Sequence, residues 1–80
     1  MPKLPRISGA EAARILERLG FVRDRQTGSH VILKKQIWEK DIRVGEIVCV
    51  VPLRRELKVG TLSGVLKQAQ VSVDEFLAAM

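Results

Sequence analysis

Apolar side chains near the start of the chain follow a helical period. Ser8 and Glu11 have the spacing of a capping box, in which a hydroxyl and a carboxylate bind free backbone N–H groups of the first helical turn. Four apolar residues then recur at helical spacing, namely Ala12, Ile15, Leu16 and Leu19. Gly20 interrupts the pattern, as glycine often does at the end of a helix. A helix is therefore predicted over about residues 9–19.

The next part of the chain changes to the residue types of strands. Residues 21–26 lose the helical period, Thr27-Gly28 is typical of a turn, and residues 29–35 are rich in β-branched and apolar side chains. This pattern predicts a β-hairpin.

A polar segment precedes the third predicted strand. Residues 36–45 are polar and mixed in charge, which favours a long hairpin loop, and Gly45 is expected to open the next strand. Residues 46–51 are continuously β-prone, and Pro52 ends the strand because proline cannot donate a ladder hydrogen bond.

The last quarter of the chain returns to helical spacing. Thr61 is a suitable N-cap for a helix over about residues 62–69, which carries Leu62, Val65, Leu66 and Ala69 at helical intervals. Ser72 and Glu75 form a second capping box and predict a short terminal helix.

The element order is therefore α-β-β-β-α-α, which predicts an α+β fold. We expect a three-stranded antiparallel sheet with the helices packed on one face, because sequential strands flanked by helices form such layers. The order matches that of double-stranded-RNA-binding domains. Eighty residues suffice for one modest core, so residues 1–80 are expected to form a single domain.

Charge narrows the choice of partner. Fourteen Lys and Arg against nine Asp and Glu give a formal charge of +5, which favours an anionic partner. Nucleic acid comes first, and a membrane surface or an acidic protein stays open. The few aromatic residues argue against a protein that stacks successive bases on exposed rings.

Several classes of site are disfavoured by composition. One cysteine and one histidine supply neither an internal disulfide nor a closed zinc site, so no metal or small-molecule cofactor is expected. Cys49 is most simply a small apolar core residue. No apolar run has the length of a membrane span or signal peptide, so no membrane partner and a cytoplasmic location are expected.

His30 is the candidate for proton transfer. Imidazole is the side chain suited to exchanging protons near neutral pH, and His30 follows directly on Gly28-Ser29, where a turn meets a strand. Histidines also occupy such positions without any catalytic role.

An ordered set of short motifs resembles the HicA toxin family. The motifs are Gly20-Phe21, Gly28-Ser29-His30, Val51-Pro52, Gly60-Thr61-Leu62 and Leu66-Lys67-Gln68-Ala69. The resemblance implies an endoribonuclease that cleaves mRNA without a metal, is held inactive by a HicB-type antitoxin, and uses His30 as its catalytic histidine.

One position departs from the family pattern. Many relatives carry a second histidine two residues after the Val-Pro pair, where this chain has Arg54. His30 would then act alone, or with help from a lysine, an arginine or water. Arginine does not donate a proton readily, but it can bind phosphate through two N–H groups. Weakened catalysis is one expected consequence.

Six basic residues are candidates for phosphate contacts, although most basic side chains simply face water. They are Lys34, Lys35, Arg54, Arg55, Lys58 and Lys67. Ser29 is a minor candidate for orienting the imidazole or the phosphate, and Thr61 is a minor candidate for binding phosphate. Each has a stronger structural explanation, Ser29 in its turn and Thr61 as a helix cap. Trp38 could anchor a partner or pin its loop.

Two further interpretations stay open. A non-catalytic double-stranded-RNA-binding module explains the same charge and fold, but it would tolerate the loss of His30. A plain protein-interaction domain would lack a steep salt dependence of RNA affinity. Both alternating sets of the third strand are apolar, so an antitoxin or a second protomer is expected to cover one face.

Overall fold

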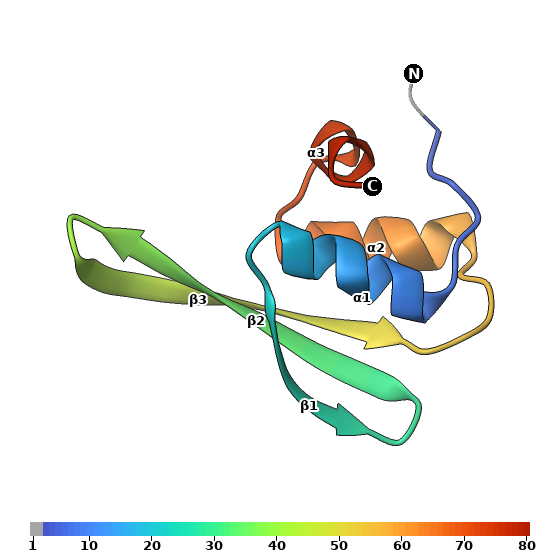
Figure 1. Ribbon diagram of the computed structural model, residues 1–80, viewed down its shortest axis with the longest axis horizontal. Coiled ribbons are helices and arrows are strands. Elements are labelled where there is room, and N and C mark those ends of the chain that lie inside the picture. Colours follow the sequence, from blue (N-terminus) through green and yellow to red (C-terminus); the bar gives the residue numbers. More distant parts are fainter. Residues whose placement is uncertain (1–2) are drawn as a thin grey trace.

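The computed structural model describes residues 3–80 and has the predicted α+β architecture. Its elements are α1 (Gly9–Arg18), β1 (Val22–Thr27), β2 (His30–Glu39), β3 (Ile42–Pro52), α2 (Val59–Ala69) and α3 (Val73–Ala78). The strands form one antiparallel sheet in the order β1-β2-β3. The helices lie on one side of this sheet, as predicted (Figure 1).

The core lies between the helices and one face of the sheet. Side chains alternate between the faces of a strand, and Val31 and Leu33 of β2 and Cys49 and Val51 of β3 are at most 1% exposed. They share one hydrophobic cluster with buried residues of all three helices, including Leu16, Leu62 and Phe76. We call the side of the sheet that faces away from the helices the open face.

The start of α1 confirms the prediction made from its cap. The Ser8 hydroxyl accepts a hydrogen bond from the Glu11 backbone N–H at 3.0 Å, and the Glu11 carboxylate accepts one from the Ser8 N–H at 3.2 Å. The helix ends at Arg18, one residue before the expected end, and Gly20 follows with φ +99°. Glycine adopts this φ without steric cost.

The prediction of a long loop over residues 36–45 is wrong. Strand β2 continues to Glu39, β3 begins at Ile42, and only Lys40 and Asp41 connect them. Both residues have positive φ, +48° and +69°, as in the type I′ turns that suit the twist of paired strands. Gly45 does not open β3 but pairs with Ile37 inside it.

This hairpin projects past the helices, so its outer half has no helical cover (Figure 1). Polar residues are therefore compatible with strand structure there, which explains why the polar pattern resembled a loop. Because β3 skips one residue between the Ile37–Gly45 and Trp38–Arg43 pairs, Val44 forms a bulge in β3, and β2 stays regular.

The predicted start of the second helix also needs correction. Helix α2 begins at Val59, and its N-cap is Lys58 without a side-chain cap hydrogen bond, so Thr61 lies inside the helix. The fully buried Leu57 precedes the cap and donates its N–H to the Ile7 carbonyl at 2.8 Å. Tertiary packing thus positions this helix start.

The predicted terminal helix is present as α3. The Ser72 and Glu75 capping box forms, and Phe76 is fully buried. Hydrogen bonds from the backbone N–H of Ser72, and then from its hydroxyl, lower the pKa of Glu75. None of the helices found in residues 3–80 is long and apolar enough to cross a membrane.

The end of β3 is held against the start of α1. The Gly9 N–H donates to the Arg54 carbonyl at 2.9 Å. A Cβ at Gly9 would overlap the Pro52 carbonyl oxygen and lie 2.9 Å from Leu53 Cα. Only glycine allows this close approach of two backbones.

We predict that Gly9→Ala destabilises the protein by about 1–3 kcal/mol, because the new methyl group meets backbone that cannot move aside cheaply. Gly64→Ala is the matched control. Gly64 lies within α2 and has nothing within 4 Å of its Cβ direction, so alanine should stabilise the fold by up to about 1 kcal/mol. Urea unfolding measures both changes, and equal effects would contradict the close packing at Gly9.

We also predict that replacing Lys40-Asp41 by Asn-Gly stabilises the protein by about 0.4–1 kcal/mol, because these residues adopt positive φ at lower cost. The thermal midpoint should rise by a few degrees. A fall in the midpoint would argue against the two-residue turn.

Candidate active site

A tight turn and two neighbouring strands hold His30 at the start of the central strand. Gly28 and Ser29 connect β1 to β2, and Gly28 has φ +58° at the first turn position. His30 pairs with Thr27 of β1 on one side and with Pro52 of β3 on the other. Its side chain is exposed, and the strands on either side, β1 and β3, fix its backbone.

His30 lies on the open face. The next residue, Val31, is 1% exposed and points into the core, so His30 points the opposite way. This geometry presents an imidazole to solvent from a rigid frame. In this position the imidazole can accept a proton from a ligand that lies across the sheet, or donate one to it.

Arg54 lies two residues beyond Pro52, the strand partner of His30. The Leu53 N–H donates to the Ser29 carbonyl at 2.6 Å, which ties the end of β3 to the turn before His30. The Arg54 carbonyl accepts the Gly9 N–H, so the backbone of Arg54 is fixed just beyond Pro52, the strand partner of His30. The side chains of Arg54 and Arg55 are exposed.

The two candidate lysines on β2 lie on opposite faces. Lys34 shares the open face with His30, and its Nζ lies 3.5 Å from an Asp24 carboxylate oxygen. Lys35 points to the helix side, where its Nζ is 5.7 Å from the centre of the buried Phe21 ring. Of this pair, only Lys34 can meet a ligand that also meets His30.

The remaining candidates are spread more widely. Ser29 is exposed in the turn that precedes His30. Lys58 is the N-cap residue of α2, and Lys67 lies in the last turn of that helix. Thr61 is partly buried within α2. The structure does not bring Lys67 to the open face, because α2 covers the other side of the sheet (Figure 1).

Arg25 is a residue that the sequence pattern missed. It pairs with Ile32, which is two residues from His30 on β2, so Arg25 and His30 share the open face. The register shifts between Arg23 and Arg25, which makes Asp24 an extra residue in β1. This bulge reverses the facing of Arg25, and no sequence signal indicated it.

The other reactive or metal-binding groups give no competing site. Cys49 is 1% exposed, and burial raises the pKa of its thiol to about 11, so it is no thiolate nucleophile at neutral pH. Within residues 3–80, no three His, Cys, Asp or Glu side chains are grouped to hold a metal ion.

Comparison with known proteins gives one finding at the level of family. A sequence model described as the HicA toxin of bacterial toxin-antitoxin systems matches residues 9–71. The match runs from the start of α1 past the end of α2 and includes both His30 and Arg54. No curated protein matches the chain.

Proposed function

Since the chain belongs to the HicA toxin family of bacterial toxin-antitoxin systems, we propose that it is an endoribonuclease that cleaves mRNA with His30 as its proton-transfer group. The observation that carries this proposal is the placement of its sole histidine. His30 stands exposed on the open face, at the turn end of a strand paired on both sides. A binding surface alone has no need of an imidazole there.

The proposed reaction needs only groups that the chain and the RNA supply. Neutral His30 takes the proton from a ribose 2′-hydroxyl, and the 2′-oxygen forms a bond to the adjacent phosphorus as the bond to the 5′-oxygen breaks. The imidazolium, or water, returns a proton to the leaving 5′-oxygen. The products are a 2′,3′-cyclic phosphate and a free 5′-hydroxyl.

We assign charge stabilisation to the arginines that flank His30. Arg54 follows the strand partner of His30, and Arg25 shares its face. A guanidinium can bind two phosphate oxygens at once, and it opposes the negative charge that develops in the transition state. Ser29, Lys34 and Arg55 are proposed to contact phosphates that flank the cleaved bond. Lys35, Lys58 and Lys67 belong to the helix side and would reach RNA only elsewhere.

A HicB-type antitoxin is the proposed protein partner. Val48, on the open face of β3, is 44% exposed, and none of the helices within residues 3–80 covers this side of the sheet. Apolar surface on the same face as the proposed catalytic residue would let an antitoxin bind and block RNA at once.

We predict that His30→Gln lowers the cleavage rate of labelled single-stranded RNA by about 10²–10⁴-fold, because an amide cannot accept the 2′-hydroxyl proton. The assay contains EDTA, and circular dichroism checks that the variant is folded. Equal cleavage by both proteins would remove His30 from the mechanism. RNA binding without cleavage by either protein would favour the non-catalytic double-stranded-RNA-binding module.

For Arg54→Ala we expect kcat to fall by about 10–100-fold, since one donor to the developing phosphate charge is lost. Arg54→Lys should retain part of the rate, because the charge stays but the paired N–H groups do not. Arg14→Ala is the control, as this exposed arginine lies on α1 at the helix side. A similar loss in the control would indicate a nonspecific charge effect.

A further inference from the structure

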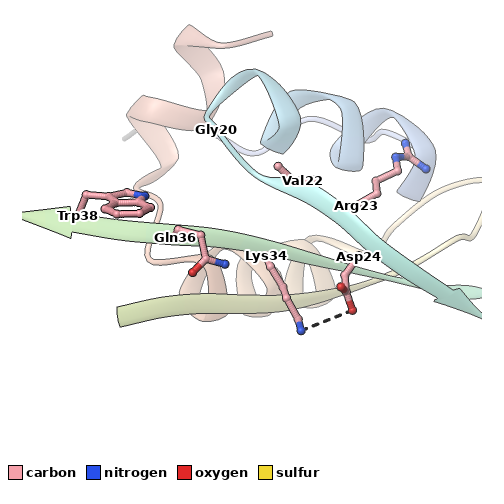
Figure 2. Close-up of a pocket in the computed structure, with 7 residues that line it drawn as sticks. All are labelled: Gly20, Val22, Arg23, Asp24, Lys34, Gln36 and Trp38. Atoms are coloured by element: carbon pink, nitrogen blue, oxygen red, sulfur yellow. Dashed lines mark ion pairs between the residues drawn. The ribbon is translucent and has the colours of Figure 1, made fainter. Parts of the chain in front are cut away.

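A shallow hollow lies beside β2, far from His30. It has a volume of about 450 Å³, and its lining includes Val22, Lys34, Gln36 and Trp38 (Figure 2). The pairing of β1 with β2 ends at Val22 and Lys34, so β2 continues beyond this point with a partner on one side only. The hollow occupies the place that a longer β1 would fill.

Trp38 is the unusual residue of this hollow. It is the chain's sole tryptophan, and 60% of it is exposed. His30, Lys34 and Trp38 are separated by even numbers of residues along a strand without a bulge, so all three belong to the open-face set. The twist of the hairpin rotates the Trp38 end of this face relative to the His30 end.

Polar and charged residues neighbour Trp38 along β2 and across the strand pair. Arg43 is the strand partner of Trp38, and its guanidinium donates to the Gln36 amide oxygen at 3.0 Å. The Gln36 amide N–H in turn donates to a Glu46 carboxylate oxygen at 2.7 Å. Protein interfaces are depleted of charge at their centre, whereas sites for single-stranded nucleic acid combine exposed aromatic rings with basic side chains along the strand.

We infer that Trp38 stacks on a base of single-stranded RNA whose cleaved phosphate lies at His30, an inference that rests on the proposed function. Eight residues of strand separate the two side chains, a distance of about 26 Å, which spans several nucleotides. Lys34 stands midway. Although Asp24 lies 3.5 Å from its Nζ, an ammonium group has three N–H donors and keeps two for a phosphate.

Charge on the open face favours RNA as the occupant. Its basic side chains are Arg25, Lys34 and Arg43, and its acidic side chains are Asp24 and Glu46. Arg54 and Arg55 follow Pro52, the strand partner of His30, and add positive charge at the proposed site of cleavage. A base on Trp38 would thus fix the register in which the RNA crosses His30.

The first test uses Trp38 as its own reporter. The unchanged chain is titrated with a single-stranded 2′-O-methyl RNA of about ten nucleotides, within the usual 4–16-nucleotide size of such sites; this RNA lacks the nucleophilic hydroxyl. Stacking predicts a saturable fall in tryptophan emission that follows the binding of the RNA. Binding without any change in emission would overturn the inference and leave Trp38 to a protein partner.

The second test compares variants by the anisotropy of a labelled RNA. Trp38→Ala should weaken binding about tenfold, and Trp38→Phe less, because a smaller ring still stacks. Ile42→Ala is the matched control, since Ile42 is 66% exposed on the same hairpin but pairs with Glu39 on the opposite face. Equal affinities for Trp38→Ala and the unchanged chain would contradict the inference.

Cleavage kinetics separate this inference from the proposed function. Trp38→Ala should raise KM about tenfold and leave kcat nearly unchanged, because the ring lies far from the reacting phosphate. A fall in kcat with constant KM would overturn the positioning role. Quenching of Trp38 by RNA in a protein that cleaves none would remove the proposed nuclease but retain the base-binding site.

Discussion

The alternation of side chains along β2 is the constraint on which the rest of the structure depends. Val31 and Leu33 fill the core beneath the helices, and this burial fixes which face every other residue of the strand occupies. A shift of one residue would bury His30 and expose both apolar side chains. The hydrophobic effect thus orients the imidazole, although His30 itself makes no contribution to the core.

The same strand joins the two ends of the proposed RNA path. Its first residue is His30, paired on both sides, and its far half pairs only with β3 and carries Trp38. The close contact between Gly9 and the end of β3 then places Arg54 at the His30 end. Backbone contacts thus fix the positions from which the functional side chains extend.

Local signals made much of the fold predictable. The capping boxes at Ser8 and Ser72 form as expected, because their partners lie three residues away in the sequence. The strand order and the placement of the helices on one face also follow from the pattern of apolar residues. Cys49 is buried, as its position between apolar neighbours indicated.

The features that escaped prediction depend on contacts distant in sequence or on backbone geometry. The Lys40-Asp41 turn contains no glycine, so its positive φ values left no mark in the sequence. The start of α2 depends on the packing of Leu57. Arg25 shares the open face because of the bulge at Asp24, which the sequence did not indicate. In contrast, the alternation of side chains along a strand is enough to place Lys34 and Lys35 on opposite faces.

The central claim, that His30 activates a ribose hydroxyl, is tested most directly on the RNA itself. A labelled RNA is compared with one in which a single 2′-deoxy sugar stands at the mapped cleavage position, and the product ends are identified. The proposed mechanism predicts a 2′,3′-cyclic phosphate from the first RNA and no cleavage of the second at that position. Cleavage at the deoxy sugar, or a product with a 5′-phosphate, would contradict it.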